Sequence, residues 1–225
     1  MFACIRISII IKPRDKSVKN YLVLIGDMVG SKAQRDRNSL QRSFAQTLQK
    51  AQKKYGTAFI SPLTLTIGDE FQAVLEKSDD LFSLLTFIET QLDGVQFRYG
   101  MGLGGIDTDI NSQQAIGMDG PAFHRARAAI EQAKKEQRRF CFKSGHSGQE
   151  ERINILLNWV DYAIKRWNAQ RKKIFLYYCE QYTQKEIAAR LRITQPAVSQ
   201  NITAEIFQLT VQTVKLIQKE IGEMI

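Results

Sequence analysis

The sequence has few of the residues that build metal sites and disulfide frameworks. Its 225 residues include three cysteines and two histidines. Cys4, Cys141 and Cys179 lie far apart in the chain and form no C-x-x-C pair. We therefore expect neither a structural zinc site nor a disulfide scaffold. Separate thiols in apolar surroundings are typical of a reducing compartment, which favours a cytoplasmic protein.

Long apolar runs are also missing. No segment approaches the roughly 20 consecutive apolar residues that a helix needs to cross a bilayer. Residues 7–11 are apolar apart from Ser8, but Lys12 follows them directly, and the segment is too short for a secretory signal and has no cleavage site. We predict no membrane segment, and we interpret residues 1–20 as an N-terminal extension or an extra strand.

Positive charge is abundant. Lysine and arginine number 32 against 23 aspartates and glutamates, which gives a formal net charge of +9. Such an excess favours an anionic partner, whether nucleic acid, a nucleotide or an acidic membrane surface. The hydrophobic content of 44% is sufficient for one large domain or two small ones with proper cores.

Hydrophobic periodicity predicts an α+β domain over residues 21–143. The apolar run 21–25 indicates a buried strand that ends at Gly26-Asp27. A helix is expected to begin after Ser31 and to end at Gly56. Two short apolar runs, joined by Gly68, Asp69 and Glu70, then predict a hairpin over residues 63–75.

The remaining pattern predicts two more helices and two more strands. A helix over 81–92, a strand entering the glycine-rich residues 100–105, a helix from Pro121 and a short strand at 140–142 follow in order. The glycines allow either close approach of a phosphate or tight packing. This order is typical of a mixed sheet with helices on one face. The small polar residues 144–149 predict a linker, and residues 150–225 an all-α domain.

Asp27 and Asp69 form the candidate site. The end of the first strand can lie beside the hairpin tip, which brings the two carboxylates together. They repel unless a cation lies between them, and Mg²⁺ takes one or two carboxylates with phosphate oxygens and water. Main-chain N–H groups at the following helix start would face such phosphates. The residues that supply them are Met28, Val29, Gly30 and Ser31.

Simpler interpretations of these acids stay open. Asp27 can cap a turn, and Gly68-Asp69 is a common hairpin signal. Glu70 is a third ligand, a base or a solvated turn residue, and the sequence favours the last.

Residues 183–202 have the pattern of a helix-turn-helix. Thr183 and Thr194 are placed to cap two short helices that are separated by a turn at Arg192-Ile193. The second helix of such a motif enters the major groove of DNA. Base contacts are expected from Gln195, Ser199, Gln200 and Asn201. Phosphate contacts are expected from Lys185, Arg190, Arg192 and Thr194.

Two further interpretations concern this region. Three helices of this kind also occur as a packing unit or a protein-contact unit. The terminal apolar stripe over residues 206–224 predicts an amphipathic helix, suited to packing on the domain or to pairing with a second copy. A homodimer through this C-terminal helix would match a palindromic DNA site.

Several segments resemble known families. LIGDMVGS, TIGDEFQAV, FRYGMGLGGI and GMDGPAFHRARAAI follow the order of the metal-binding segments and glycine-rich strand of class III nucleotidyl cyclases. GDEF resembles the signature of GGDEF diguanylate cyclases. In both families two acids of a palm-type core hold the metals, and the resemblance maps them onto Asp27 and Asp69. With its C-terminal motif, the chain from residue 21 onward resembles the SatD family of bacterial proteins.

This resemblance implies a ferredoxin-like, cyclase-like palm followed by a helix-turn-helix domain. The chain departs from the cyclase pattern at Leu65, His124 and Ala128, which stand where cyclases have a purine-reading lysine, a ribose-contacting asparagine and a transition-state arginine. Loss of that cation removes much electrostatic stabilisation. Arg125 and Arg127 are the candidates to replace it and to bind phosphate.

Three functions follow as hypotheses. The first is a DNA-binding regulator of transcription whose palm-like domain binds Mg²⁺ and a nucleotide. The second is a Mg²⁺-dependent nucleotidyl transferase or nucleotide hydrolase that uses Asp27 and Asp69. The third is a degenerate palm that serves as a scaffold. Whether the chain is an enzyme stays open at this point.

Overall fold

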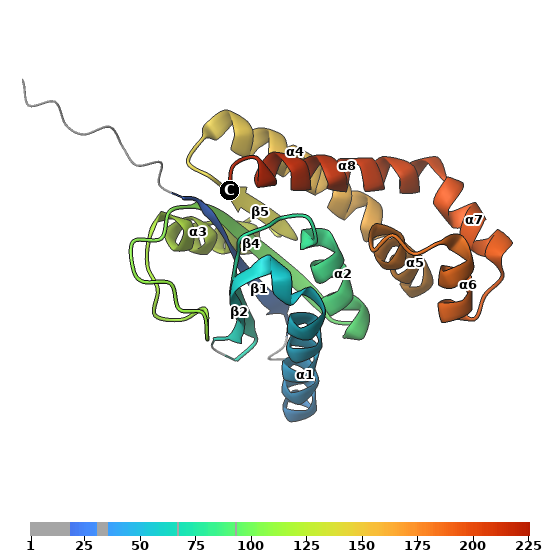
Figure 1. The fold of residues 1–225 in the computed structure, drawn as a ribbon, viewed down its shortest axis with the longest axis horizontal. Helices are drawn as coiled ribbons and strands as arrows, with labels where there is room; N and C mark the ends of the chain where they lie inside the picture. Colours follow the sequence, from blue (N-terminus) through green and yellow to red (C-terminus); the bar gives the residue numbers. More distant parts are fainter. Residues whose placement is uncertain (1–18, 31–35, 67, 93) are drawn as a thin grey trace, which may run out of the picture.

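The computed structural model describes residues 19–30, 36–66, 68–92 and 94–225; most of the predicted N-terminal extension lies outside this part. The sheet region contains β1 (Tyr21–Val29), α1 (Arg37–Tyr55), a 3₁₀ turn (Gly56–Ala58), β2 (Phe59–Leu65), β3 (Glu70–Leu75), α2 (Leu81–Gln91), β4 (Gln96–Gly104), α3 (Pro121–Lys135) and β5 (Phe140–Lys143). The helices that follow are α4 (Ser147–Ile164), α5 (Ala169–Cys179), α6 (Gln184–Leu191), α7 (Gln195–Thr203) and α8 (Glu205–Gly222) (Figure 1). The predicted α+β class is confirmed.

The five strands form one mixed sheet in the order β2-β3-β1-β4-β5. β1 runs antiparallel to both β3 and β4, β2 runs antiparallel to β3, and β5 runs parallel to β4. In this register Asp27 lies opposite Glu70 on one side and opposite Arg98 on the other. The central strand therefore carries the first candidate acid, between the hairpin strand and β4.

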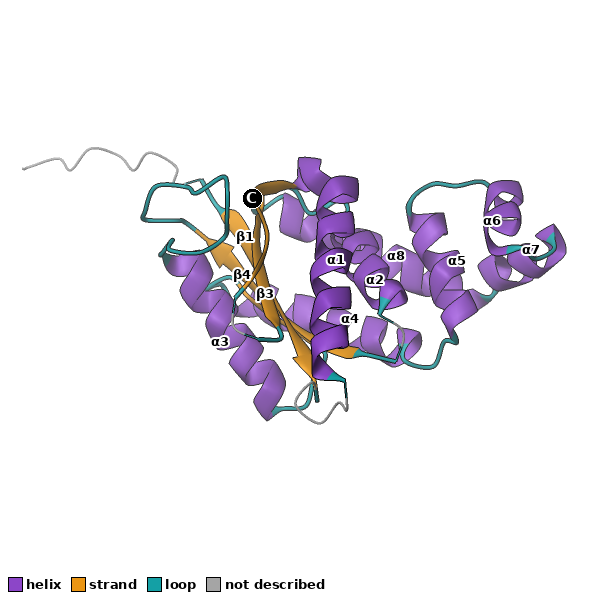
Figure 2. Ribbon diagram, turned by 90° about the horizontal axis from the view of Figure 1, so that it is seen from below, coloured by secondary structure: helices purple, strands orange, loops and turns teal. Residues whose placement is uncertain are grey.

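Helices cover both faces of the sheet, whereas the sequence predicted helices on one face only. α1 and α2 pack on one face together with C-terminal helices, and α3 packs on the other face, where Ala126 and Ile130 meet Val23 and Ile25 (Figure 2). The physical reason lies in β1, where every residue from 22 to 25 is buried. A strand that is apolar on both sides needs cover on both sides.

The glycine-rich strand β4 lets α3 approach closely. Gly100, Gly102 and Gly104 all face this helix, and a Cβ on Gly102 would lie 2.1 Å from the main-chain nitrogen of Ala126. A Cβ on Gly100 would lie 2.5 Å from the nitrogen of Ile130. The glycines therefore serve helix-strand packing, which is one of the two roles that the sequence left open.

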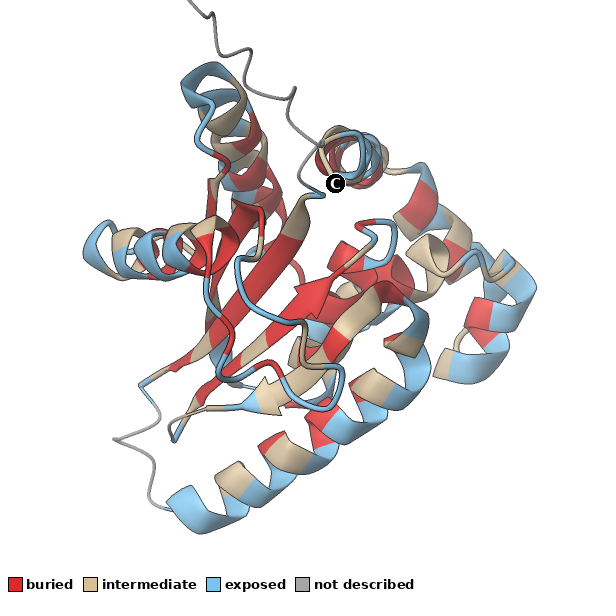
Figure 3. Ribbon diagram, turned by 60° about the vertical axis from the view of Figure 1, so that its left-hand side comes forward, coloured by how far each residue is buried: buried red, intermediate tan, exposed pale blue. Residues whose placement is uncertain are grey.

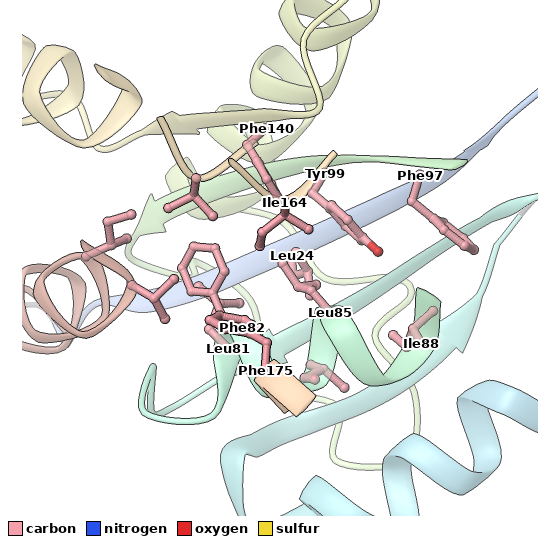
Figure 4. Packing of buried hydrophobic residues seen from close by; sticks show 14 of the residues in the cluster. Leu24, Leu81, Phe82, Leu85, Ile88, Phe97, Tyr99, Phe140, Ile164 and Phe175 are labelled. Carbon is pink, nitrogen blue, oxygen red and sulfur yellow. The ribbon is translucent and has the colours of Figure 1, made fainter. Parts of the chain in front are cut away.

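One apolar core joins the sheet to the C-terminal helices. The rings of Tyr99 and Phe140 stack with centroids 5.6 Å apart, and Ile164 of α4 and Phe175 of α5 are buried in the same cluster (Figure 4). Figure 3 shows that buried residues concentrate on the strands and on the helix sides that face them. Motion of α4 or α5 is thus coupled to the sheet through close packing.

The predicted linker, residues 144–149, is short, and side-chain hydrogen bonds from α4 hold its main chain. The Glu150 carboxylate accepts hydrogen bonds from the N–H groups of Ser144 (2.7 Å) and Gly145 (2.6 Å). Asn154 bonds both the N–H and the C=O of Phe142, each at 2.9 Å. The segment connects β5 directly to α4, which begins within it.

The terminal helix α8 packs back along the molecule. Its end reaches the start of β1, where Asn20 donates a hydrogen bond to the Met224 carbonyl (2.9 Å), and Ser78 donates one to the Gln218 carbonyl (2.6 Å). Packing on the domain, one of the two roles expected for this helix, is therefore observed, and pairing with a second copy stays a prediction. None of the described helices is long and apolar enough to span a membrane.

Candidate functional site

The sequence predicted that Asp27 and Asp69 lie side by side, and the structure places the main chain of Asp69 next to β1. Asp27 is opposite Glu70 in the β1–β3 register, and the N–H of Met28 donates a hydrogen bond to the carbonyl of Asp69 over 3.0 Å. β1 continues to Val29, so Asp27 lies inside the strand rather than at its predicted end. Strand pairing thus places Asp27 directly beside Glu70, with Asp69 in the turn just before β3.

Helix α3 supplies a cation to each acid of the β1–β3 pair. Lys134 Nζ lies 3.4 Å from Asp27 Oδ1. Arg127 donates two hydrogen bonds to the Glu70 carboxylate, at 2.7 and 2.8 Å. The Glu70 side chain is 12% exposed, and a carboxylate so buried needs a charged partner. The sequence-based interpretation of Glu70 as a solvated turn residue is therefore wrong.

The folded structure disfavours the ionised form of Asp27. Burial raises the pKa of Asp27, the ion pair with Lys134 opposes this, and the nearby charges of Asp69 and Glu70 raise the pKa further. The net direction is upward from the ordinary value of 3.8. Carboxyl groups whose pKa is raised by burial and by like charges are concentrated at functional sites.

The raised pKa of Asp27 predicts how stability depends on pH. The folded protein binds this proton more tightly than the unfolded chain does, so ionisation of Asp27 lowers the free energy of unfolding as pH rises above 3.8. Asp27→Asn is expected to raise the melting temperature at pH 7, with a difference from the unsubstituted protein that shrinks towards pH 4. Circular dichroism melts at both pH values measure this.

Glu131→Gln is the matched control for that substitution. Glu131 lies 3.6 Å from the same lysine, Lys134, but its side chain is 60% exposed, so its removal should change the melting temperature little. A melting temperature at pH 7 that falls in Asp27→Asn would show that the Lys134 pair outweighs the effect of burial, contrary to the account given above.

The carboxylates fit a divalent metal only together with a phosphate. Among the described residues, no three His, Cys, Asp or Glu side chains are grouped closely enough to hold a metal ion. Mg²⁺ commonly takes one or two carboxylates and completes its shell with phosphate oxygens and water. Asp27 and Asp69 supply that number, and Lys134, at 3.4 Å from Asp27, is the cation that a metal would have to displace.

The main-chain groups predicted to bind phosphate are arranged differently from the expectation. The N–H of Met28 is already bonded to Asp69, Val29 lies within β1 opposite Gln96, and Gly30 follows with φ +72°. Ser31 lies outside the described residues. None of the three described positions is at a helix start.

The first helix begins later than predicted. The sequence placed its start after Ser31, but α1 starts at Arg37 with Asp36 as its N-cap, whose carboxylate accepts from the N–H of Ser39 over 3.0 Å. Asp36 is as good an N-cap as serine, and its carboxylate also interacts favourably with the helix dipole.

Arg127 and Arg125 leave α3 in different directions. Arg127 reaches the acids and is bound by Glu70. Arg125 instead donates a hydrogen bond of 2.7 Å to the carbonyl of Leu103, which lies at the opposite end of the β1–β4 pair from Asp27. Of the two predicted phosphate ligands, only Arg127 is therefore at the acid pair.

Lys134 belongs to the basic segment of residues 125–143, but the sequence did not identify it as the partner of Asp27. The signal was present, because Lys134 and Arg127 are seven residues apart and so share one face of a helix. Their acidic partners were not deducible from spacing, since the pairing depends on how α3 crosses the sheet.

Helices α6 and α7 project from the body of the molecule (Figures 1 and 2). Thr183 caps α6 in a capping box, with its N–H bonded to the Glu186 carboxylate over 2.8 Å. Arg192 ends α6 in the left-handed conformation, with φ 54°, and the Thr194 hydroxyl accepts from the N–H of Ala197 over 3.4 Å. The two predicted caps are thus confirmed.

The predicted DNA-contacting residues lie on the outer side of this pair of helices. Ile187, Val198 and Ile202 form its buried side. The exposed candidates are Lys185, Arg190, Arg192, Thr194, Gln195 and Gln200, and the half-buried ones are Ser199 and Asn201.

Two of these candidates also have intramolecular partners. The guanidinium of Arg190 lies 4.2 Å from the ring centroid of Tyr182. The Asn201 amide donates a hydrogen bond of 2.9 Å to the carbonyl of Ala197. Exposure and position make DNA contact feasible for the whole set, and the contact itself stays a prediction.

Comparison with known proteins gives a family and a distant structural likeness. A solved structure described as "Structure of a bacterial light-regulated adenylyl cyclase" is similar at 15% sequence identity, covers 55% of this chain and 74% of that chain, and has a TM-score of 0.41. A likeness at this level supports no conclusion about activity. No curated protein matches the sequence. The family model described as "SatD family" matches residues 21–220, and the chain therefore belongs to the SatD family.

Proposed function

We propose that the protein is a DNA-binding regulator in which α6 and α7 form a helix-turn-helix, attached to a ferredoxin-like, cyclase-like sheet domain that binds a nucleotide with Mg²⁺. The observation that carries the proposal is the projecting α6–α7 pair. Both helices have side-chain caps, the turn between them is tight, and polar residues cover the outer side.

The shape of this pair suits the major groove. α7 buries Val198 and Ile202 against its neighbours and exposes Gln195 and Gln200 to solvent. In a helix-turn-helix the N-terminal residues of the second helix contact base edges, and glutamine can form two hydrogen bonds to adenine. Gln195 is the first residue of α7, which is where such a contact is expected.

Cations border the same surface. Lys185 lies in the first turn of α6, Arg190 in its last turn, and Arg192 in the connection to α7. All three are exposed, and the formal net charge of the chain is +9. Phosphate contacts of this kind supply most of the affinity of non-specific DNA binding.

Lys185→Gln tests the DNA-binding proposal through the salt dependence of binding. Loss of one phosphate contact should weaken binding to any duplex and should reduce the slope of log K against log salt concentration by about one. Fluorescence anisotropy with a duplex of random sequence, at several salt concentrations, measures both quantities.

The control is Lys53→Gln, which removes an exposed lysine from α1. This variant should keep the slope of the unsubstituted protein. Equal changes in both variants would indicate general charge attraction, and an absence of duplex binding by the unsubstituted protein would contradict the proposal outright.

A second part of the proposal concerns the acid pair. Asp27 and Asp69 would hold Mg²⁺ that arrives with a nucleotide, and the metal would neutralise the phosphate charge. Glu70 fixes the Arg127 guanidinium through two hydrogen bonds, and Lys134 lies beside Asp27. A phosphate entering this site meets both cations, and charge-assisted contacts of this kind are strong.

The pH 7 melts described above test this part when they are repeated with Mg²⁺ and each common nucleoside triphosphate or cyclic dinucleotide. A ligand at 100 times its Kd stabilises by about 2.7 kcal/mol. This stabilisation should appear as a rise in the melting temperature of the unsubstituted protein, and the rise should be absent in Asp27→Asn. Release of phosphate or pyrophosphate in the same mixtures would favour the transferase or hydrolase hypothesis, and no shift with any ligand would favour the scaffold.

A further inference from the structure

A groove lies where the sheet meets the corner between α4 and α5. It consists of two adjoining cavities of about 310 and 330 Å³. The residues common to both are Glu89, Val95, Gln96 and Lys172. Each volume falls within the range of small-molecule sites. Neither Asp27 nor Asp69 lines the groove. It adjoins the acid pair through Arg98, which lies opposite Asp27 in the β1–β4 register.

The groove is strongly cationic. Its basic lining residues are Arg98, Arg138, Arg139, Lys165, Lys172 and Lys173. Its two acids, Glu89 and Asp161, both bind Arg139, at 2.6 Å and 3.5 Å. The Arg139 side chain is only 15% exposed. Both lining acids are thus used to neutralise a nearly buried guanidinium and pair with no other cation of the groove.

The remaining cations include four without an acidic partner. Arg138 is paired with Glu136 at 2.9 Å. In the part of the chain that the structure describes, no ion pair involves any of the other lining cations. Those cations are Arg98, Lys165, Lys172 and Lys173. Like charges gathered in a concave surface repel one another and focus the field on an incoming anion.

Apolar side chains line the same groove. Val95 and Phe97 of the β4 region and Trp167 of the α4–α5 corner contribute this surface. The ring of Trp167 is held in place by stacking on Phe207, with centroids 5.5 Å apart. Pockets for organic ligands typically combine such apolar surface with a few polar groups that set orientation.

We propose that this groove binds a small phosphorylated organic anion, with its phosphate groups facing Arg98, Lys165 and Lys172 and its organic part against Val95 and Trp167. Duplex DNA is a poorer fit, because its phosphates follow an extended surface whereas these cations surround a concave site.

The position of the groove gives the ligand a route to the projecting helices. Lys172 and Lys173 belong to α5, which leads into α6, and the opposite wall belongs to β4. An anion bound between these walls would contact both α5 and the sheet. It shifts the arrangement of α6 and α7 only if it binds one arrangement better than another.

Titration calorimetry with the full chain tests the proposal, with ATP and inorganic pyrophosphate as probes in buffer that contains EDTA and no Mg²⁺. We expect both probes to bind, ATP more tightly, and we expect the double variant Lys165→Gln/Lys172→Gln to weaken binding of each at least tenfold. Lys50→Gln/Lys53→Gln removes two exposed lysines of α1 and should change neither affinity.

Lys134→Gln separates this site from the acid pair, because it removes a cation that a phosphate would meet there, and it should retain ATP binding without metal. The proposal is overturned if neither probe binds, if the two double variants lose affinity equally, or if pyrophosphate binds as tightly as ATP. Displacement of ATP by a short duplex, with DNA affinity lost in Lys165→Gln/Lys172→Gln, would assign the groove to DNA and would also overturn it.

Discussion

Gly102→Ala is expected to prevent the stable packing of α3 on the sheet. The added Cβ would lie 2.1 Å from the nitrogen of Ala126 and 2.3 Å from the carbonyl oxygen of Ala122. Both are main-chain atoms of α3, so no side-chain rotation relieves the contact and the helix has to move. Overpacking of a core usually costs about 1–3 kcal/mol, and a clash with two backbone atoms should reach roughly 3 kcal/mol or more.

Gly148→Ala is the control for this effect. Gly148 lies in the first turn of α4, and a Cβ there meets no atom within 4 Å. Because alanine is the better helix former, this change should be neutral or stabilising by up to about 1 kcal/mol. Urea unfolding followed by circular dichroism compares the two variants. If Gly102→Ala proved as stable as the unsubstituted protein, α3 could not lie as close to β4 as described above.

The double substitution Gln195→Ala/Gln200→Ala is expected to remove sequence preference while leaving most non-specific DNA affinity in place. Each glutamine that forms two hydrogen bonds to a base is worth about 1–3 kcal/mol of discrimination. Loss of one such contact should lower the affinity for a preferred site by roughly 5- to 150-fold. Both side chains are exposed, so the free energy of unfolding should change little.

Gln212→Ala provides the matched control, because Gln212 is an exposed glutamine on α8, outside the α6–α7 pair. Anisotropy titrations compare a preferred duplex with a scrambled one for each variant. Equal losses on the two duplexes in Gln195→Ala/Gln200→Ala would mean that these residues contact no base edges, and α7 would not be a recognition helix.

Much of the sheet was predictable because its strands are short apolar runs between clear turn signals. The run over residues 22–25 also carried the information that both faces are covered, since each of its residues is apolar. The prediction of helices on one face followed element order and overlooked that signal. The late start of α1 was missed because Ser31 and Asp36 are both good caps, and sequence alone does not choose between them.

The candidate site was predictable in part. Pairing of the first strand with the hairpin, which the sequence suggested, brings Asp27 next to the turn that holds Asp69. The pairing of Lys134 with Asp27, and of Arg127 with Glu70, depends on the path of α3 over the sheet, which the β4 glycines determine through close packing. The basic groove combines residues from strands and helices far apart in the sequence, so no local sequence pattern predicts it.

The most direct test of the DNA-binding proposal is selection of duplexes from a random-sequence library by the full chain, run in parallel with Gln195→Ala/Gln200→Ala. The account predicts enrichment of a short motif by the unsubstituted protein and loss of the adenine positions of that motif with the double variant. Enrichment of no motif, or of the same motif by both proteins, would contradict it.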